Sequence, residues 1–82
     1  MNVTVLLFGP AAKAAGSSRI VVKIDGPSCT CRQLQASLLQ IEPCLQAYAG
    51  RSRWAVNHAF ASDDAQIAPG DEVALIAAVS GG

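Results

Sequence analysis

The carboxyl-terminal stretch reads Asp71-Glu72-Val73-Ala74-Leu75-Ile76-Ala77-Ala78-Val79-Ser80-Gly81-Gly82. The run from Val73 to Ala77 is apolar and contains β-branched residues, a pattern that predicts a short buried strand. Ala68-Pro69-Gly70 before it is typical of a turn. After the strand we expect a flexible tail, residues 79–82, that could extend by roughly 13 Å at about 3.3 Å per residue.

The two glycines of this tail admit two interpretations. Gly81 and Gly82 have no Cβ, so the tail could pass where a side chain would clash. A glycine pair is equally typical of a frayed terminus, and spacing alone leaves that alternative open. The terminal carboxylate favours a function, because it is a group that occurs once and can be chemically activated.

Length and composition indicate a single domain over residues 1–82. Hydrophobic residues make up 51% of the chain, and six basic side chains balance six acidic ones. A net charge of zero provides no basic field for nucleic acid. The apolar residues 1–8 are too few for a membrane span and lack the features of a signal peptide, so we expect a cytoplasmic protein.

Two strands are expected near the amino end. Residues 2–8 place apolar side chains on both faces, which is typical of a central strand. Residues 19–24 alternate, with Ile20, Val22 and Ile24 facing inward, and predict a half-solvated strand antiparallel to the first. Between them, residues 11–15 favour one or two helical turns that Gly16 ends.

One main helix is predicted after Thr30. Thr30 and Gln33 fit a capping box, in which each side chain bonds the other's backbone amide. An apolar stripe follows at helical spacing and is interrupted at Pro43. The stripe comprises Leu34, Leu38, Ile41 and Leu45, and is expected to lie on the sheet.

Two short strands, residues 53–57 and 59–61, are expected around a turn at Asn57-His58. The predicted fold class is therefore α+β, with one mixed sheet of four to five strands and one main helix across a face. The first and last strands, with Val5 and Val73 in the core, are expected to be parallel neighbours at the sheet centre.

The side chains do not describe an enzyme active site. Cys29-Thr30-Cys31 has too few nearby ligands for a metal, and together with Cys44 makes an odd number of cysteines, which favours free and idle thiols. Cys31 is expected in the first helical turn, where the helix dipole could lower its pKa, but this position alone does not make it a nucleophile. His58 is expected to be solvated on its turn, without a partner.

The chain resembles the small, sulfur-carrying subunit of molybdopterin synthase, a ubiquitin-like β-grasp protein. Val56-Asn57, Ile67-Ala68-Pro69-Gly70-Asp71-Glu72-Val73-Ala74 and the terminal Val79-Ser80-Gly81-Gly82 carry the resemblance, together with Val5-Leu6-Leu7-Phe8. It covers nearly the whole chain. Two features depart from the family: Ala77 and Ala78 stand where prolines are usual, and Leu75-Ile76 where aromatic residues are usual.

The resemblance implies a mechanism without an active site of the chain's own. A ubiquitin-activating-type enzyme would adenylate the Gly82 carboxylate, and a desulfurase or rhodanese-type donor would convert the transient AMP adduct to a thiocarboxylate, a 1-thioglycine. The large catalytic subunit would then receive the tail, Val79, Ser80 and Gly81, in a heterotetrameric synthase that builds molybdopterin. Leu75, Ala77 and Ala78 are the expected partner surface. No bound cofactor, metal, nucleic acid or membrane is expected.

Three alternatives remain open. The chain could be a sulfur carrier of the same fold for thiamine thiazole or cysteine synthesis. It could be a ubiquitin-like modifier whose Gly82 forms an isopeptide bond to a lysine. It could also be an interaction module with an inert end, in which case the tail would be dispensable.

Overall fold

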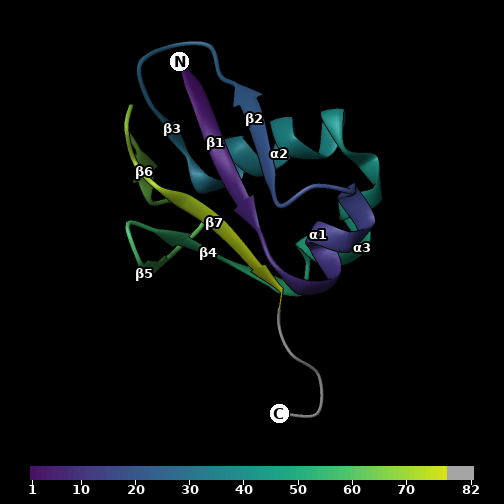
Figure 1. Ribbon diagram of the computed structural model, residues 1–82. Coiled ribbons are helices and arrows are strands. Elements are labelled where there is room, and N and C mark those ends of the chain that lie inside the picture. The colour runs from purple at the N-terminus through teal and green to yellow at the C-terminus, as the bar shows by residue number, and fades with distance from the viewer. Residues whose placement is uncertain (78–82) are drawn as a thin grey trace.

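The computed structural model describes residues 1–77, and they form a mixed β-sheet with helices on one face (Figure 1). The elements are, in chain order, β1 (Asn2–Leu7), α1 (Gly9–Ala15), β2 (Arg19–Lys23), β3 (Cys29–Thr30), α2 (Cys31–Ile41), η1 (Pro43–Leu45), α3 (Gln46–Ala49), β4 (Ser52–Val56), β5 (Ala59–Ala61), β6 (Gln66–Ile67) and β7 (Val73–Ala77). This α+β arrangement is the predicted β-grasp fold.

The main sheet has five strands in the order β2-β1-β7-β4-β5. β1 and β7 are parallel, with Val5 opposite Val73, while β2 and β4 pair antiparallel on their outer sides. The central, parallel placement of the first and last strands is therefore confirmed. β3 and β6 form a separate two-stranded sheet that was not predicted, since each strand has only two residues.

Local capping explains where the helices begin and end. Thr30 Oγ1 accepts from Gln33 N at 3.1 Å, and Gln33 Oε1 accepts from Thr30 N at 2.8 Å, so the capping box of α2 is confirmed. α1 ends as expected at Gly16, whose φ of 72° is the left-handed conformation that glycine adopts without strain.

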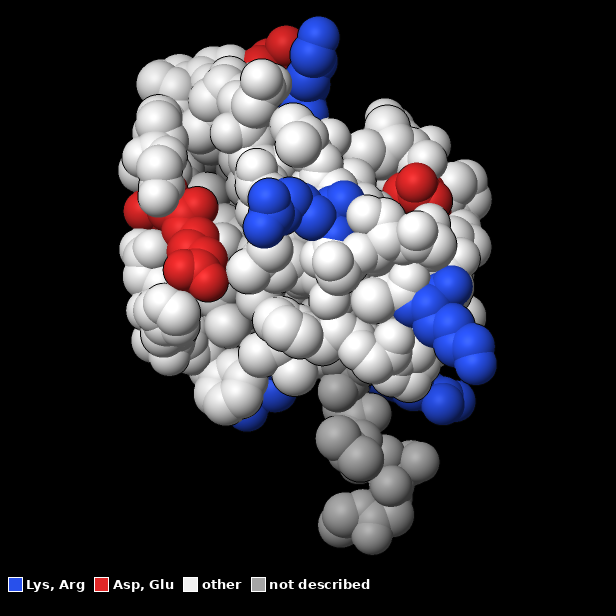
Figure 2. All heavy atoms as spheres, viewed as in Figure 1, with Lys and Arg blue, Asp and Glu red and all other residues white. Residues whose placement is uncertain are grey.

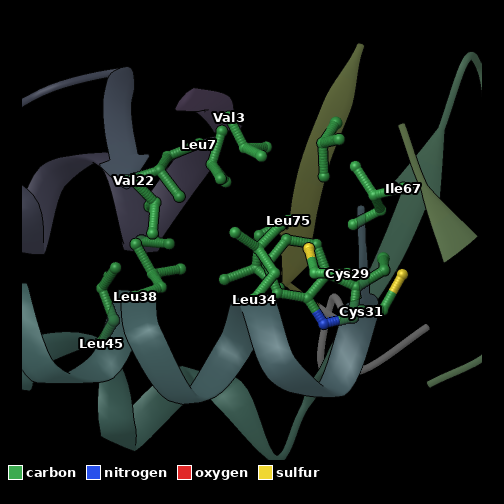
Figure 3. Close-up of a cluster of buried hydrophobic side chains, with 14 residues drawn as sticks. Val3, Leu7, Val22, Cys29, Cys31, Leu34, Leu38, Leu45, Ile67 and Leu75 are labelled. Carbon is green, nitrogen blue, oxygen red and sulfur yellow. The ribbon is translucent and has the colours of Figure 1, made fainter. Parts of the chain in front are cut away.

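The core lies between α2 and one face of the sheet, as Figure 3 shows. It is built from the inward residues of β1 and β7 and from Leu34, Leu38 and Leu45. The expectation for Ile41 is wrong, because its side chain is 52% exposed. α2 ends at Ile41, and the chain turns at Glu42 into η1, so that Leu45 packs in the core in place of the next helical position.

The second face of the sheet is open. Both faces of β1 are apolar in sequence, yet only Val3, Val5 and Leu7 are buried, while Leu6 is half-buried and Phe8 is 51% exposed. The helices lie on the other side of the sheet (Figure 1). The apolar side chains of Leu6 and Phe8, which suggested a strand covered on both faces, therefore remain accessible on the open face of the sheet.

Candidate functional site

The structure describes the strand that leads into the predicted tail. β7 ends at Ala77, which pairs with Ser52 of β4. The residues expected to react or to enter a partner, Val79, Ser80, Gly81 and Gly82, lie outside the described residues, as does Ala78. Within the described residues, the candidate site is the surface beside the end of β7.

Leu75 does not belong to that surface. Its side chain is 1% exposed and lies in the core, with Leu7 and Trp54 opposite it on the neighbouring strands. Its assignment to a partner surface is therefore wrong. Because side chains alternate along a strand, Ala74 and Ile76 face the open side instead.

An apolar hollow occupies the open face next to β7. Its volume is about 340 Å³, and β1, β4, β5, β7 and the turn between β4 and β5 contribute to it. The lining consists of Leu6, Phe8, Ala55, His58, Phe60, Glu72, Ala74 and Ile76. Phe8 is 51% exposed and Phe60 is 61% exposed. Two of the few aromatic side chains are therefore accessible to solvent near β7.

Arg53 of β4 contacts Phe60, one of the residues that line the hollow. Its guanidinium carbon lies 4.2 Å from the centroid of the Phe60 ring, a cation–π contact. Phe60 pairs with Ala55, so Arg53 is its diagonal neighbour on the same face of the sheet. The contact keeps a positive charge and an aromatic ring together at the surface.

The turn between β4 and β5 is tied to the start of β7. Asn57 N donates to Glu72 O at 2.7 Å, Glu72 N donates to Asn57 Oδ1 at 3.0 Å, and Asn57 Nδ2 donates to Asp71 Oδ1 at 3.1 Å. Asn57 and His58 have φ of 52° and 69°, as the predicted turn requires. These bonds set the register of β7 against β4.

Two side chains beside this turn, His58 and Asp71, make contacts that the sequence did not predict. His58 does have a partner, since its Nε2 lies 3.2 Å from Glu72 Oε2, although both side chains are exposed. Asp71 Oδ2 accepts from Ala68 N at 2.8 Å. This backbone bond first, and the bond from Asn57 second, lower the pKa of the Asp71 carboxyl below its ordinary value.

The cysteines are free, as predicted, and the pKa of Cys31 is raised and not lowered. Cys29 and Cys31 are buried and Cys44 is exposed. Burial raises the pKa of Cys31, and the nearby Asp63 carboxylate and Cys29 add to the rise. Burial raises the pKa of Cys29 as well.

Residues 1–77 contain neither a metal-binding cluster nor a membrane-spanning helix. No group of three or more His, Cys, Asp or Glu side chains in this part could hold a metal ion. Within the same residues, no helix is both long and apolar enough to span a bilayer.

The sequence from residue 5 to residue 82 matches the model of the ThiS family. The chain belongs to this family. The match extends over β1 to β7 and the tail, and so includes the hollow and the strand beside it. A search of curated protein sequences found no match for this ThiS-family chain.

Solved structures with the same fold include SAMP1 proteins and a molybdopterin-converting factor. The chain is 28% identical to SAMP1 from Haloferax volcanii, with a TM-score of 0.87 and 100% of both chains covered. It is 25% identical to a chain in the complex of subunits 1 and 2 of the molybdopterin-converting factor from Helicobacter pylori 26695, with a TM-score of 0.70 and 100% of both chains covered. SAMP1 from Methanosarcina acetivorans, at 19% identity and a TM-score of 0.81 over 99% of this chain and 96% of that one, shows the fold alone.

Proposed function

We propose that the chain is a sulfur carrier that donates sulfur from a thiocarboxylate at Gly82 to a pyranopterin precursor of molybdopterin. The observation that carries the proposal is the sequence Val-Ser-Gly-Gly directly after a central, buried strand in a member of the ThiS family. The parallel pairing of β7 with β1 and its antiparallel pairing with β4 hold the base of the tail. A rigid base would let a partner receive the carboxylate at a fixed reach.

Loading the carrier takes two steps on other proteins. A ubiquitin-activating-type enzyme joins a Gly82 carboxylate oxygen to the α-phosphorus of ATP, and pyrophosphate leaves. A sulfide-equivalent nucleophile from a sulfur donor then forms a C–S bond to the acyl carbon, and AMP leaves with the C–O electrons. Where the donor is a persulfide, a thiol reductant supplies the two electrons that cleave its S–S bond.

Transfer takes place in a large catalytic subunit. The complex of two molybdopterin-converting-factor subunits among the structural relatives supports this kind of partner. The narrow tail enters its active site, where the thiocarboxylate sulfur forms a C–S bond to an electrophilic carbon of the precursor, and a leaving group departs from that carbon with its bonding electrons. Water then attacks the acyl carbon of the resulting thioester, and the C–S bond to that carbon breaks. The sulfur stays on the product as a thiolate, and the Gly82 carboxylate is restored.

The apolar hollow provides the docking surface for that subunit. Phe8 and Phe60 are exposed and Ile76 is half-buried in this hollow, and aromatic anchors such as the two phenylalanines dominate the free energy of many interfaces. Ala77 is the end of β7, and with Ala78 it would lie where the interface meets the tail.

Reconstitution tests the proposal. The chain is mixed with the large subunit, the pyranopterin precursor, the activating enzyme, ATP and a sulfur donor, and molybdopterin is measured. We expect product only when all components are present, and we expect intact mass to show an oxygen-to-sulfur exchange at the terminus before product forms. If the chain gains sulfur but no molybdopterin forms, the result would indicate a sulfur carrier for thiazole or cysteine synthesis.

A protein modifier is the second candidate, favoured by the likeness to SAMP1 from Haloferax volcanii, a small archaeal modifier protein, at 28% identity and a TM-score of 0.87. The same adenylated carboxylate would be attacked by a lysine amine instead of by sulfur, and AMP would leave as an isopeptide bond formed. Lysine-linked adducts ending in Gly82, recovered from cells and absent when Gly82 is deleted, would identify this function.

A further inference from the structure

We propose that the end of the molecule from which β7 leaves is a basic docking surface for an acidic rim on the proteins that receive the tail. The formal net charge is zero, yet the charges are unevenly distributed along the strand direction. Lys13, Arg19, Arg51 and Arg53, here called the basic end, share one end of the sheet. The inference rests on the proposed function, because it concerns the partners of the same tail.

Strand pairing places these side chains around the end of β7. Arg53 pairs with Ile76, and Arg51 directly precedes Ser52, which pairs with Ala77. Arg19 pairs with Leu6, which in turn pairs with Ala74 of β7. In Figure 2, Lys and Arg side chains lie on both sides of this end of the molecule, and the acidic side chains visible in that view lie away from it.

Lys13 completes the basic end from the helical layer. It lies in the last turn of α1, which follows β1 and contacts β7. Glu42 is the acidic residue of this region, because it precedes η1, which packs on α1. The ion pairs within residues 1–77 involve Arg32 and His58, so Glu42 does not neutralise Lys13 by a direct contact there.

The opposite end has only a small acidic excess. Asp71 and Glu72 precede β7, and Asp25 follows β2, so all three lie where the strands are farthest from the basic end. Two cations lie at the same end, Lys23 of β2 and the N-terminal ammonium, which donates to Ile24 O at 2.7 Å. Asp63 and Asp64 share a single cation, Arg32, at distances of 3.9 and 2.9 Å. Among the described residues, positive charge is therefore concentrated at the basic end, and an uneven field of this kind orients the molecule as it approaches a charged partner.

The contacts around the basic end favour a role in docking to another protein. The four side chains are exposed, and the Phe60 ring holds Arg53 in place at 4.2 Å. The basic end also adjoins the apolar hollow through Arg53 and Arg19, so that one surface offers an apolar centre with a charged border. This is the common layout of protein interfaces, in which charge speeds association and apolar contacts slow dissociation.

Nucleic acid fits the same surface less well. Proteins that bind phosphate backbones combine many cations with a strongly basic domain. Here the formal net charge is zero, and the acidic side chains of the opposite end would repel a polyanion that extended beyond the basic end. An acidic rim of limited size on a folded partner avoids this repulsion.

A matched pair of charge reversals on β2 tests the proposal. Arg19 and Lys23 are both exposed and lie on the same face of β2. Arg19 belongs to the basic end, whereas Lys23 lies at the opposite end of the strand. Arg19→Glu and Lys23→Glu change the net charge equally. The measurement is kcat/KM for carrier-dependent pyrophosphate release by the cognate activating enzyme, with ATP saturating, at about 20 mM and about 500 mM NaCl, a range that shortens the Debye length several-fold.

We expect Arg19→Glu to lower kcat/KM about fivefold at low salt, against less than twofold for Lys23→Glu, with both converging on the wild type at high salt. Arg51→Glu should behave like Arg19→Glu and serves as the second variant if one fails to fold by circular dichroism. Saturating carrier should restore the wild-type kcat, because the reversals affect docking and not the carboxylate.

The outcomes separate this inference from the proposed function. Equal effects of Arg19→Glu and Lys23→Glu, or effects that salt does not alter, would overturn the acidic rim while leaving sulfur transfer intact. Loss of retention on single-stranded DNA in Arg19→Glu and Arg51→Glu, with enzyme kinetics unchanged, would overturn it in favour of nucleic acid. A wild-type chain that never gains sulfur would instead refute the carrier function.

Discussion

Val5 of β1 and Val73 of β7 lie directly opposite each other in parallel register, and both side chains are fully buried. This pair joins the two ends of the chain at the centre of the sheet. It determines which end of the sheet β7 leaves, and therefore places that strand end beside Phe8 and the basic end. Packing at this pair connects the fold to the position of the end of β7.

Val73→Ala should destabilise the fold by about 2 kcal/mol, from lost burial of two methyl groups and the cavity left behind. Val21→Ala is the control, because Val21 lies on the edge strand β2 and is 53% exposed, so its cost should stay within about 0.5 kcal/mol. Urea unfolding measures both. Equal losses of stability in the two variants would contradict the central role of the pair.

Phe60→Ala should leave the fold intact and weaken binding to the large subunit about tenfold, as truncating an aromatic anchor commonly does. It removes a side chain from the hollow and the support of Arg53. Ile41→Ala is the matched control, with a side chain 52% exposed on the helical side. Titration calorimetry gives both affinities, and a larger loss for Ile41→Ala would move the docking surface to α2.

Asp71→Asn should lower stability at neutral pH but not in acid. The folded-state pKa of Asp71 lies below its ordinary value of 3.8, so the ionised carboxylate stabilises the fold above that pH, and this contribution is lost as pH falls through the folded-state pKa. Urea midpoints of variant and wild type, measured from pH 7 downward, should converge in acid. A difference that stays constant with pH would show that the hydrogen bonds do not depend on the charge.

Replacing Cys29, Cys31 and Cys44 with Ala should leave sulfur loading unchanged. Burial raises the pKa of Cys29 and Cys31, so both thiols stay protonated and unreactive at neutral pH, whereas Cys44 is exposed. Iodoacetamide should therefore label Cys44 first in the folded protein. Loss of loading in a folded triple variant would indicate a persulfide on the chain itself.

Local chemistry and strand pattern were sufficient for much of the fold. The capping box at Thr30 and Gln33 acts through backbone amides three residues apart, and such local signals can be read from sequence. The apolar character of residues 2–7 and 73–77 likewise predicted the central pair of strands. Ile41 was misplaced because periodicity does not reveal that the chain turns at Glu42.

The candidate surface was less accessible to sequence reasoning. A strand that is apolar on both faces does not reveal whether a helix or a partner covers the second face, so Phe8 was not assigned to a surface. In the continuous apolar run of β7, Leu75 and Ile76 cannot be told apart without the register against β1. The contact of Arg53 with Phe60 likewise depends on strand pairing.

Deletion of Gly82 is the decisive test of the carrier function. The variant and the wild type are incubated with the activating enzyme, ATP and sulfur donor, and intact mass and molybdopterin formation are measured beside thermal unfolding. We expect an unchanged unfolding midpoint and complete loss of sulfur gain and product, because shortening the tail by one residue misplaces the carboxylate by about 3.3 Å. A Gly82-deleted chain that still gains sulfur at its terminus and supports normal molybdopterin formation would contradict the carrier function.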